Sequence, residues 1–521
     1  MLRSLRDVKR LFHAARVLSR HDALIPREFA HRIPRALKLM RAVLGSRSRL
    51  DRVALPGLRL ARALESLGPA YIKLGQLLAT RPDIIGEETA TALATLQDRL
   101  PPFPTELARA EVEAALGAPI EVLFASFDEP FAAASIAQVH RATTDSEPLR
   151  AVAVKILRPG VEAEFARDLS SFAFAARWAE RFFSEARRLR VVELVHTLAV
   201  GVALELDLRM EAAAASEFAE RTEADEAFRV PAVDWERTSG RVLTTEWVDG
   251  TPLRSAAELE AAGHDPRRIA VLIVRQFLTQ ALRDGFFHAD MHQGNLFVDR
   301  EGRLVCVDFG IMGRLDAAMR RFMAETLAGF LARDYRRVAD IHYEAGFVPR
   351  RHPASLFAQA LRAIGEPVFG HPASTVSMAR LLQQLFDTTR RFDMELQPQL
   401  VLLQKTMVVV EGVARGLYPE LDIWEAARPV IESWMVGQVG PEARLRDAAE
   451  GITALGRLAR EFPHLLHNAE IVSGMLAEGG LRLHPDTAGD IARAQVARTR
   501  HVRIALWIAA GALVVLAAGI L

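Results

Sequence analysis

The chain has 521 residues, half of them apolar and a quarter charged, which argues against extensive disorder and leaves room for more than one domain. The single cysteine, Cys306, excludes an intramolecular disulfide and a multi-cysteine zinc site, and it favours a reducing compartment. Charge is unevenly spread, because residues 1–62 hold 16 Lys or Arg against 4 acidic residues. The chain therefore begins with a basic segment.

Residues 1–118 are predicted to form a helical extension, with prolines at 101, 102 and 104 interrupting the pattern. The basic segment lacks the apolar core of a secretory signal peptide, although Arg-rich starts also occur in organelle transit peptides. Two interpretations stay open: a solvated helix face, and contact with an anionic membrane, to which each Lys or Arg adds about 1 kcal/mol. We expect no nucleic-acid partner, because no recognised binding motif accompanies the charge.

Residues 119–249 are predicted to form a small β-rich lobe. Its predicted strands are Glu121–Phe127, Ala137–Ala142, Ala151–Leu157 and Arg241–Val248. A helical stretch over about 161–222 separates the third strand from the fourth, and Asp249 and Gly250 predict a hinge after the fourth.

Residues 250–480 are predicted to form a larger helical lobe, interrupted by short β-like pieces at Leu296–Val298 and Leu304–Val307. A linker over 481–503 follows. The order of small β-rich lobe, hinge and helical lobe predicts an α+β, bilobal, protein-kinase-like fold with a helical N-terminal extension and a helix-rich C-lobe.

The last predicted element is an apolar helix over 504–521, where no residue is charged. At about 1.5 Å per residue it would span roughly 27 Å, close to the hydrocarbon thickness of a bilayer. Arg498, Arg500 and Arg503 precede it, so the positive-inside rule predicts a single-pass C-terminal transmembrane anchor with a cytoplasmic body, at the inner membrane if the source is bacterial. A buried C-terminal helix or a dimer within the membrane is the alternative.

The segment that carries the chemistry is residues 288–295, His-Ala-Asp-Met-His-Gln-Gly-Asn, with Val-Asp-Phe-Gly at 307–310. A kinase catalytic loop has an Asp that orients the attacking group and, five positions later, an Asn that holds a metal ion; the DFG aspartate holds Mg²⁺. Asp290, Asn295 and Asp308 fit this spacing. We therefore expect ATP and Mg²⁺ as cofactors, with Asp290 catalytic and Asn295 and Asp308 as metal ligands.

Upstream, Ala-Val-Ala-Val-Lys ends at Lys155, on an alternating strand, as in the kinase element whose lysine binds the α and β phosphates. Glu211, on the next helical stretch, is the candidate partner of this lysine. An ordinary kinase has a Gly-rich loop before the lysine, whereas this chain has Ala132, Ala133, Ala134 and Ser135. Because a Cβ keeps backbone N–H groups away from phosphates, the ATP-binding loop is expected to hold the nucleotide differently.

These residues resemble the UbiB family, the atypical kinase-like proteins of ubiquinone biosynthesis that include the ADCK-type proteins of mitochondria. Lys73-Leu-Gly-Gln76 is similar to the KxGQ element of the family, and Glu205-Leu-Asp207 to its ExD element. The resemblance implies that Lys73 and Gln76 meet Glu205 and Asp207 over the place where a protein substrate would lie. It also implies regulation by this contact, and ATP hydrolysis in preference to protein phosphorylation.

The expected function is that of an atypical kinase-like ATPase supporting ubiquinone biosynthesis at a membrane, with membrane lipid, quinone precursors and ubiquinone-biosynthesis enzymes as the implied partners. Two alternatives stay open. One is a small-molecule phosphotransferase, because residues 288–295 also resemble the catalytic loop of aminoglycoside-type kinases. The other is a nucleotide-sensing scaffold without turnover, which would need the same phosphate and metal ligands.

Overall fold

The computed structural model describes residues 2–21, 23, 56–79, 85–93, 96, 101–369, 384, 388, 391–394 and 397–439. The chain divides into two compact units, Met1–Met435 and Val436–Leu521, and the elements below belong to the first apart from the last turn of α20. No helix within the described ranges is long and apolar enough to cross a membrane. The predicted linker (481–503) and apolar tail (504–521) lie outside those ranges.

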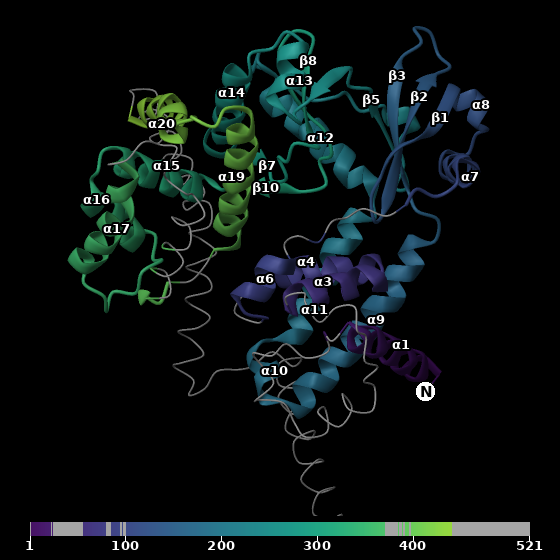
Figure 1. Cartoon of the computed structure of the whole chain (residues 1–521), viewed down its shortest axis with the longest axis horizontal. Helices are drawn as coiled ribbons and strands as arrows, with labels where there is room; N and C mark the ends of the chain where they lie inside the picture. Colours follow the sequence, from purple (N-terminus) through teal and green to yellow (C-terminus); the bar gives the residue numbers. More distant parts are fainter. Residues whose placement is uncertain are drawn as a thin grey trace, which may run out of the picture. The chain divides into compact units, whose positions relative to one another are not determined.

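The first lobe is built on a four-stranded antiparallel sheet (Figure 1). In spatial order its strands are β1 (Phe124–Ala133), β2 (Ala137–Thr144), β3 (Ala151–Leu157) and β5 (Val242–Glu246). Alternate residues of β3, Val152, Val154 and Ile156, are buried in a core shared with α7 (Thr105–Leu116) and α8 (Ile120–Leu123). Because side chains alternate along a strand, Lys155 lies on the opposite face of the sheet.

The start of the first strand differs from the prediction. Residues 120–123 form the helical turn α8, in which the Leu123 N–H donates to the Pro119 carbonyl. Strand β1 starts only at Phe124 and then continues through Pro130, where a loop was predicted. The strand tolerates Pro130 because it lies at the sheet edge and its register shifts on both sides of that residue.

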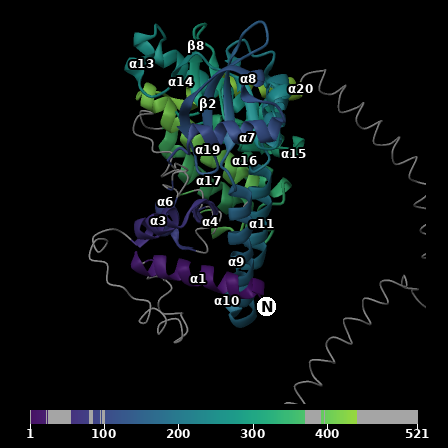
Figure 2. The ribbon, with the colours of Figure 1, turned by 90° about the vertical axis from the view of Figure 1, so that its right-hand side faces the viewer.

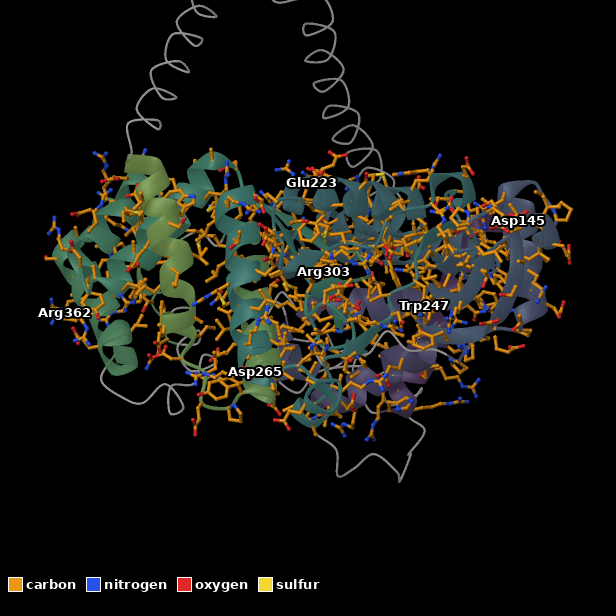
Figure 3. The ribbon with its side chains drawn as sticks, turned by 90° about the horizontal axis from the view of Figure 1, so that it is seen from above. Asp145, Glu223, Trp247, Asp265, Arg303 and Arg362 are labelled. Atoms are coloured by element: carbon orange, nitrogen blue, oxygen red, sulfur yellow. The ribbon has the colours of Figure 1, made fainter. Side chains whose placement is uncertain are left out.

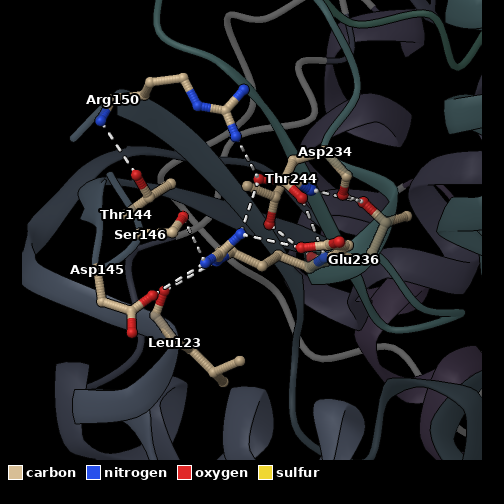
Figure 4. A network of polar contacts seen from close by, with 10 residues as sticks. Leu123, Thr144, Asp145, Ser146, Arg150, Asp234, Glu236 and Thr244 are labelled. Atoms are coloured by element: carbon tan, nitrogen blue, oxygen red, sulfur yellow. Dashed lines mark hydrogen bonds and ion pairs between the residues drawn. The ribbon is translucent and has the colours of Figure 1, made fainter. Parts of the chain in front are cut away.

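A buried arginine fastens the turn between β2 and β3 to the chain before β5 (Figure 4). The Arg237 guanidinium donates to Asp234 at 3.1 Å, to Asp145 at 3.0 Å and to the Leu123 carbonyl at 2.9 Å. Arg237 lies in the short 3-10 helix η2 (Trp235–Arg237), and its backbone carbonyl accepts the Thr244 hydroxyl at 2.6 Å. This network lies away from Lys155 and stabilises the lobe.

Four helices connect β3 to the chain before β5: α9 (Val161–Phe182), α10 (Ser184–Arg188), α11 (Val191–Glu205) and α12 (Leu208–Thr222). Helix α1 (Leu2–Arg20) packs across α9 (Figure 2), where Arg10 donates to Asp168 at 2.8 Å. Helices α3 (Pro56–Leu67), α4 (Pro69–Ala79) and α6 (Glu87–Leu93) pack on one another. They share one hydrophobic core with α9, α11 and α12, so the N-terminal extension is built into the first lobe.

The second lobe holds two small sheets under the helix α14 (Pro266–Thr279). One has the order β4-β9-β8-β6, and the other pairs β10 with β7. Their strands are β4 (Phe228–Arg229), β6 (Gly250–Pro252), β7 (Phe286–His288), β8 (Leu296–Asp299), β9 (Leu304–Cys306) and β10 (Met312–Arg314). Strands β8 and β9 match predicted pieces. The other four are two or three residues long, too short for an alternating pattern to reveal.

Helix α14 continues into a π-helical turn, η3 (Gln280–Asp284), and Gly285 then turns the chain into β7. Gly285 has φ +64°, and a Cβ there would lie 2.6 Å from the Leu315 carbonyl oxygen, so only glycine fits. The remaining helices are α13 (Ala256–Ala261), α15 (Ala317–Leu331), α16 (Tyr335–Glu344), α17 (Ala354–Phe369), α19 (Pro398–Leu417) and α20 (Ile423–Val439). Helix α19 packs along α14, and both contribute to the largest hydrophobic core (Figure 1).

Candidate functional site

A buried ion pair joins β3 to α12. Lys155 Nζ donates to both carboxylate oxygens of Glu211, at 2.8 and 2.9 Å. The side chains are 16% and 9% exposed, so little water competes for them. Helix α12 begins where Asp207 caps it by accepting the Arg209 N–H at 3.2 Å, and Glu211 lies in its first turn. The structure therefore places together the lysine and the glutamate that the sequence suggests as partners.

Asp308 adds a second carboxylate to this pair. Its Oδ2 lies 3.2 Å from Lys155 Nζ, and its side chain is 49% exposed, so it is also open to a ligand. The residue has φ +62°, in the left-handed region. This region costs most residues about 1 kcal/mol, whereas glycine, asparagine and aspartate adopt it more readily. The Gly310 N–H donates to Asp308 Oδ1 at 3.3 Å and supports this conformation.

The three charges set one another's protonation. Burial opposes the charge of Lys155, but the carboxylates of Asp308 and Glu211 outweigh it and raise the pKa of the ammonium. Burial also acts to raise the pKa of Asp308, yet the Lys155 ammonium lowers that pKa to about 2. For Glu211, burial prevails over Lys155 and raises the pKa to about 7. At neutral pH, Lys155 is charged and Asp308 is ionised.

The segment between β7 and β8 holds Asp290 and Asn295 beside Asp308. The Asn295 amide group donates to the Asp290 carbonyl at 3.1 Å, and the Val307 N–H donates to the Asn295 carbonyl at 2.9 Å. Asp290 itself is 40% exposed and lies 3.6 Å from His292 Nε2. These bonds bring the three residues predicted from spacing, Asp290, Asn295 and Asp308, onto adjoining stretches of backbone.

His288 braces this segment. Its Nδ1 accepts the Asp290 N–H at 3.1 Å, and its Nε2 lies 3.3 Å from the Val307 carbonyl, so the proton belongs on Nε2. The ring is fully buried, and burial lowers its pKa. A neutral His288 therefore ties the Asp290 loop to the Asp308 segment without handling protons. Cys306, also fully buried, is a strand residue of β9.

The alanine-rich loop forms the end of the hairpin β1–β2. Ala132 pairs with Val139 and Ala133 with Gln138, and the Ala134 N–H donates to the Ala137 carbonyl at 2.8 Å. The Ala134 amide is therefore already used within the hairpin. Ser135, by contrast, is fully buried, and its hydroxyl has no hydrogen-bond partner within the described ranges.

Sequence reasoning missed an arginine that clamps this loop. Arg158 follows β3, and its Nε and Nη2 donate to the Ala134 carbonyl at 3.0 and 2.9 Å. Its Nη2 also donates to the Pro101 carbonyl at 2.8 Å, and its guanidinium lies 5.6 Å from the Phe103 ring centroid. Arg158 thus joins the alanine-rich loop to the chain that follows the N-terminal helices. Nothing in the local sequence pattern distinguishes it from a surface arginine.

The KxGQ segment lies on α4. Lys73 Nζ binds Glu205 Oε2 at 2.7 Å, with side chains 12% and 27% exposed. Gln76, one turn further along α4, is partly buried. Asp207 instead binds the Arg209 guanidinium at 2.7 and 2.8 Å, so Glu205 and Arg209 do not form the i,i+4 surface pair that their spacing would allow. Glu205 ends α11 only three residues before α12, the helix that carries Glu211.

An aromatic and cationic cluster, also missed from the sequence, lies at the connection after β5. The Trp247 ring (labelled in Figure 3) meets the exposed Phe131 ring edge-on at 5.1 Å, and the Arg141 guanidinium lies 5.1 Å from the Trp247 ring centroid. Arg141 pairs with Ala153 across β2 and β3, so the cluster shares the sheet face of Lys155.

The oxygen groups fit a hard cation such as Mg²⁺. Within the described ranges, no three His, Cys, Asp or Glu side chains are grouped to hold a metal ion. A kinase-type site needs fewer protein ligands, because water and phosphate oxygens complete the coordination of Mg²⁺. The half-exposed Asp308 carboxylate and the Asn295 amide oxygen are the donors present for it.

Comparisons with known proteins identify the family of the chain. Residues 95–342 match the model of the ABC1 atypical kinase-like domain, and residues 361–422 match that of the UbiB helical domain. A solved structure of an Rv3197–erythromycin complex from Mycobacterium tuberculosis aligns with a TM-score of 0.48 and 24% identity over 73% of this chain and 94% of that chain.

Relatives with curated names are more similar. "Probable protein kinase UbiB" from Marinobacter nauticus is 41% identical over 473 residues, which are 89% of this chain and 85% of that protein. The protein of the same name from Aeromonas hydrophila is 43% identical over 416 residues, 79% of this chain and 76% of that protein. With this identity over most of both chains, the chain belongs to the UbiB family of atypical kinase-like proteins.

Proposed function

We propose that this protein binds ATP with Mg²⁺ and hydrolyses it in support of ubiquinone biosynthesis at a membrane. The observation that carries the proposal is the contact of one buried ammonium, Lys155, with both Glu211 and the half-exposed Asp308. A structural ion pair needs one carboxylate. The second, exposed carboxylate leaves a cationic and an anionic group facing the same ligand, which suits the phosphates and metal of a nucleotide.

Each residue then has a defined task. Lys155 binds phosphate oxygens, and Glu211 holds the ammonium in place. Asp308 and Asn295 hold Mg²⁺, which supplies charge neutralisation at the phosphates. Asp290 orients the attacking water and accepts its proton, as its exposed carboxylate allows.

Two features favour hydrolysis over phosphorylation of proteins. The hairpin uses the Ala134 amide for its own bonding, so it supplies fewer free donors than a Gly-rich loop would. Lys73 is bound to Glu205, which fixes the KxGQ segment to the end of α11, three residues before the helix that carries Glu211. We infer that this segment restricts access of a protein substrate.

The membrane part of the proposal rests on charge and apolar surface. Helix α1 exposes Arg6, Lys9, Arg16 and Arg20 along one side, next to Phe12, which is 58% exposed. Exposed basic and aromatic side chains together favour an anionic bilayer surface. The apolar residues 504–521 supply the proposed single-pass anchor.

Phosphate release measured on the full-length protein in nanodiscs tests the proposal. We expect Mg²⁺-dependent release that rises with anionic lipid or with a quinone precursor and is lost in Asp290→Asn. Asp340→Asn, in an exposed i,i+4 pair with Arg336, is the matched control and should behave as wild type. Nucleotide binding without turnover under any of these conditions would favour the scaffold alternative. Rapid phosphate transfer to added proteins would favour protein phosphorylation.

A further inference from the structure

We infer that Thr406, on α19, is a positioning residue for Asp290. A helix outside residues 95–342, the part that matches the kinase-like domain, would then fix the position of the catalytic loop. The inference rests on the proposed function, because it assumes that Asp290 acts in turnover. Thr406 is fully buried, and its Oγ1 donates to the Ala289 carbonyl at 3.0 Å. The two residues are 117 positions apart in sequence.

The Thr406 hydrogen bond adds to the hydrogen bonds that the Asp290 loop makes with nearby residues of the chain. The Asp290 N–H is fixed by His288 Nδ1, and the Asp290 carbonyl by the Asn295 amide group. The Ala289 N–H donates to the Ile311 carbonyl at 3.0 Å. The partners of these three bonds all come from residues 288–311, whereas Thr406 adds a hydrogen bond from a separate helix. Each peptide group flanking Asp290 is therefore fixed.

Packing supports the same assignment. Ala289 and Met291, on either side of Asp290, are buried in the core that also holds Leu403 and Val410 of α19. Between these two buried residues, the side chain of Asp290 is 40% exposed. A shift of α19 would therefore move the backbone on which the Asp290 carboxylate stands.

The one proton of the Thr406 hydroxyl is shared with the Leu402 carbonyl, which lies 2.9 Å from Oγ1 in the usual back-bond of a helical threonine. The Leu402 carbonyl has the Thr406 N–H as its helical partner, so it loses little when the hydroxyl is removed. The buried Ala289 carbonyl would lose the donor that α19 supplies. The consequence of removing the hydroxyl therefore falls on the catalytic loop.

Single-turnover ATP hydrolysis and nucleotide affinity, measured on the full-length protein, test this inference. Thr406→Val keeps the shape and removes the donor, so we expect turnover to fall about tenfold or more, since small misplacements of a catalytic group reduce rates strongly. Nucleotide affinity should stay within about twofold, because Lys155 and Asp308 are untouched. Thr406→Ser keeps the hydroxyl and should retain most of the turnover.

Thr222→Val is the matched control. Thr222 is a buried helical threonine whose hydroxyl, among the residues that the structure describes, bonds only its own helix, at the Phe218 carbonyl. Its substitution should change stability without changing turnover. Should Thr406→Val fail to fold, Thr406→Ala is measured in the same way. Wild-type turnover in the folded variant, or an equal loss of affinity and turnover, would overturn the role of Thr406. Wild-type turnover in Asp290→Asn would instead refute the proposed function.

Discussion

At the scale of single residues, the site depends on one ammonium shared by two carboxylates. Lys155 is nearly buried, and Glu211 and Asp308 both lie within 3.2 Å of its Nζ. Without that cation, two carboxylates would face each other in a partly buried place. Breaking a buried ion pair by removing one partner is strongly destabilising for this reason.

We predict that Lys155→Met lowers the free energy of unfolding by about 3 kcal/mol near pH 8. This value is at the lower end of the range for breaking a buried ion pair, because Asp308 is half exposed. Lys155 holds the pKa of Asp308 at about 2, so in wild type this carboxylate stabilises the fold above its unfolded pKa and loses that effect only as pH falls through about 2. In the variant both carboxylates have raised pKa values and become protonated as pH falls. The penalty should therefore shrink toward pH 5.

Urea unfolding of both proteins from pH 8 to pH 5 checks this expectation. Lys9→Met, at an exposed lysine of α1, is the control and should change stability by less than about 0.5 kcal/mol. A penalty that stays constant with pH would show that the loss comes from packing and not from charge.

At the scale of elements, Arg158 connects the alanine-rich loop to Pro101, in the chain that follows the N-terminal helices. This side chain binds Ala134 and Pro101 at once. A second link runs alongside it, because Gln138 exchanges hydrogen bonds with the backbone of Phe103, at 2.8 and 3.2 Å. The alanine-rich loop is therefore tied to residues 101–103, in the chain that follows the N-terminal helices.

We predict that Arg158→Lys weakens ATP affinity severalfold and lowers the free energy of unfolding by about 1–3 kcal/mol, because lysine lacks the planar guanidinium fork that donates to the Ala134 and Pro101 carbonyls at once. Arg150→Lys is the matched control, since Arg150 is 60% exposed and its pair with Asp234 spans 3.6 Å. Nucleotide titration and urea unfolding measure the two quantities. Equal effects of the two substitutions would mean that the hydrogen bonds of Arg158 do not position the alanine-rich loop.

The Lys73–Glu205 contact leads to a different expectation. Lys73→Ala should alter ATP turnover, because it removes the contact of the KxGQ segment with Glu205. Nucleotide affinity should be retained, because the separate pair of Lys155 with Glu211 stays intact. Glu205→Gln, which removes the same ion pair from the other side, should reproduce the effect. Loss of nucleotide binding in Lys73→Ala would instead place Lys73 among the phosphate ligands.

The sequence predicts the elements that carry a pattern and misses those that depend on distant contacts. Strand β2 begins with alternating apolar and polar residues, and β3 is a short Val-rich apolar run, so their positions can be predicted from sequence. The pairing of Lys155 with Glu211 is suggested by the kinase pattern, in which an acid on the helix that follows the lysine strand binds the lysine. By contrast, Arg158 and Thr406 act on carbonyls far away in the chain, and a backbone carbonyl leaves no trace in a sequence. The turn α8 was mistaken for strand because four residues are too few to show a helical period.

At the scale of the whole molecule, we propose a kinase-like body that two separate parts of the chain hold at a membrane. The basic face of α1 and the apolar residues 504–521 are two separate membrane contacts in this proposal. The first is electrostatic and weakens with salt, whereas the second is apolar and does not.

We predict that a truncation before Ile504 releases most of the protein from membranes at high salt and leaves a bound fraction at low salt on anionic vesicles. Replacing Arg6, Lys9 and Arg16 by Gln in the truncated protein should remove that fraction. Vesicle flotation at two salt concentrations measures both effects. Full membrane association of the truncated protein at high salt would exclude the apolar segment as the anchor.

ATP binding to the full-length protein, with and without Mg²⁺, is the most direct test of the proposed nucleotide site when wild type, Lys155→Ala and Asp308→Asn are compared. We predict Mg²⁺-dependent binding in the wild type, because Asp308 and Asn295 would supply oxygen ligands to the metal, and a loss of at least tenfold in affinity in each variant. Undiminished, Mg²⁺-dependent affinity in both variants would contradict the site.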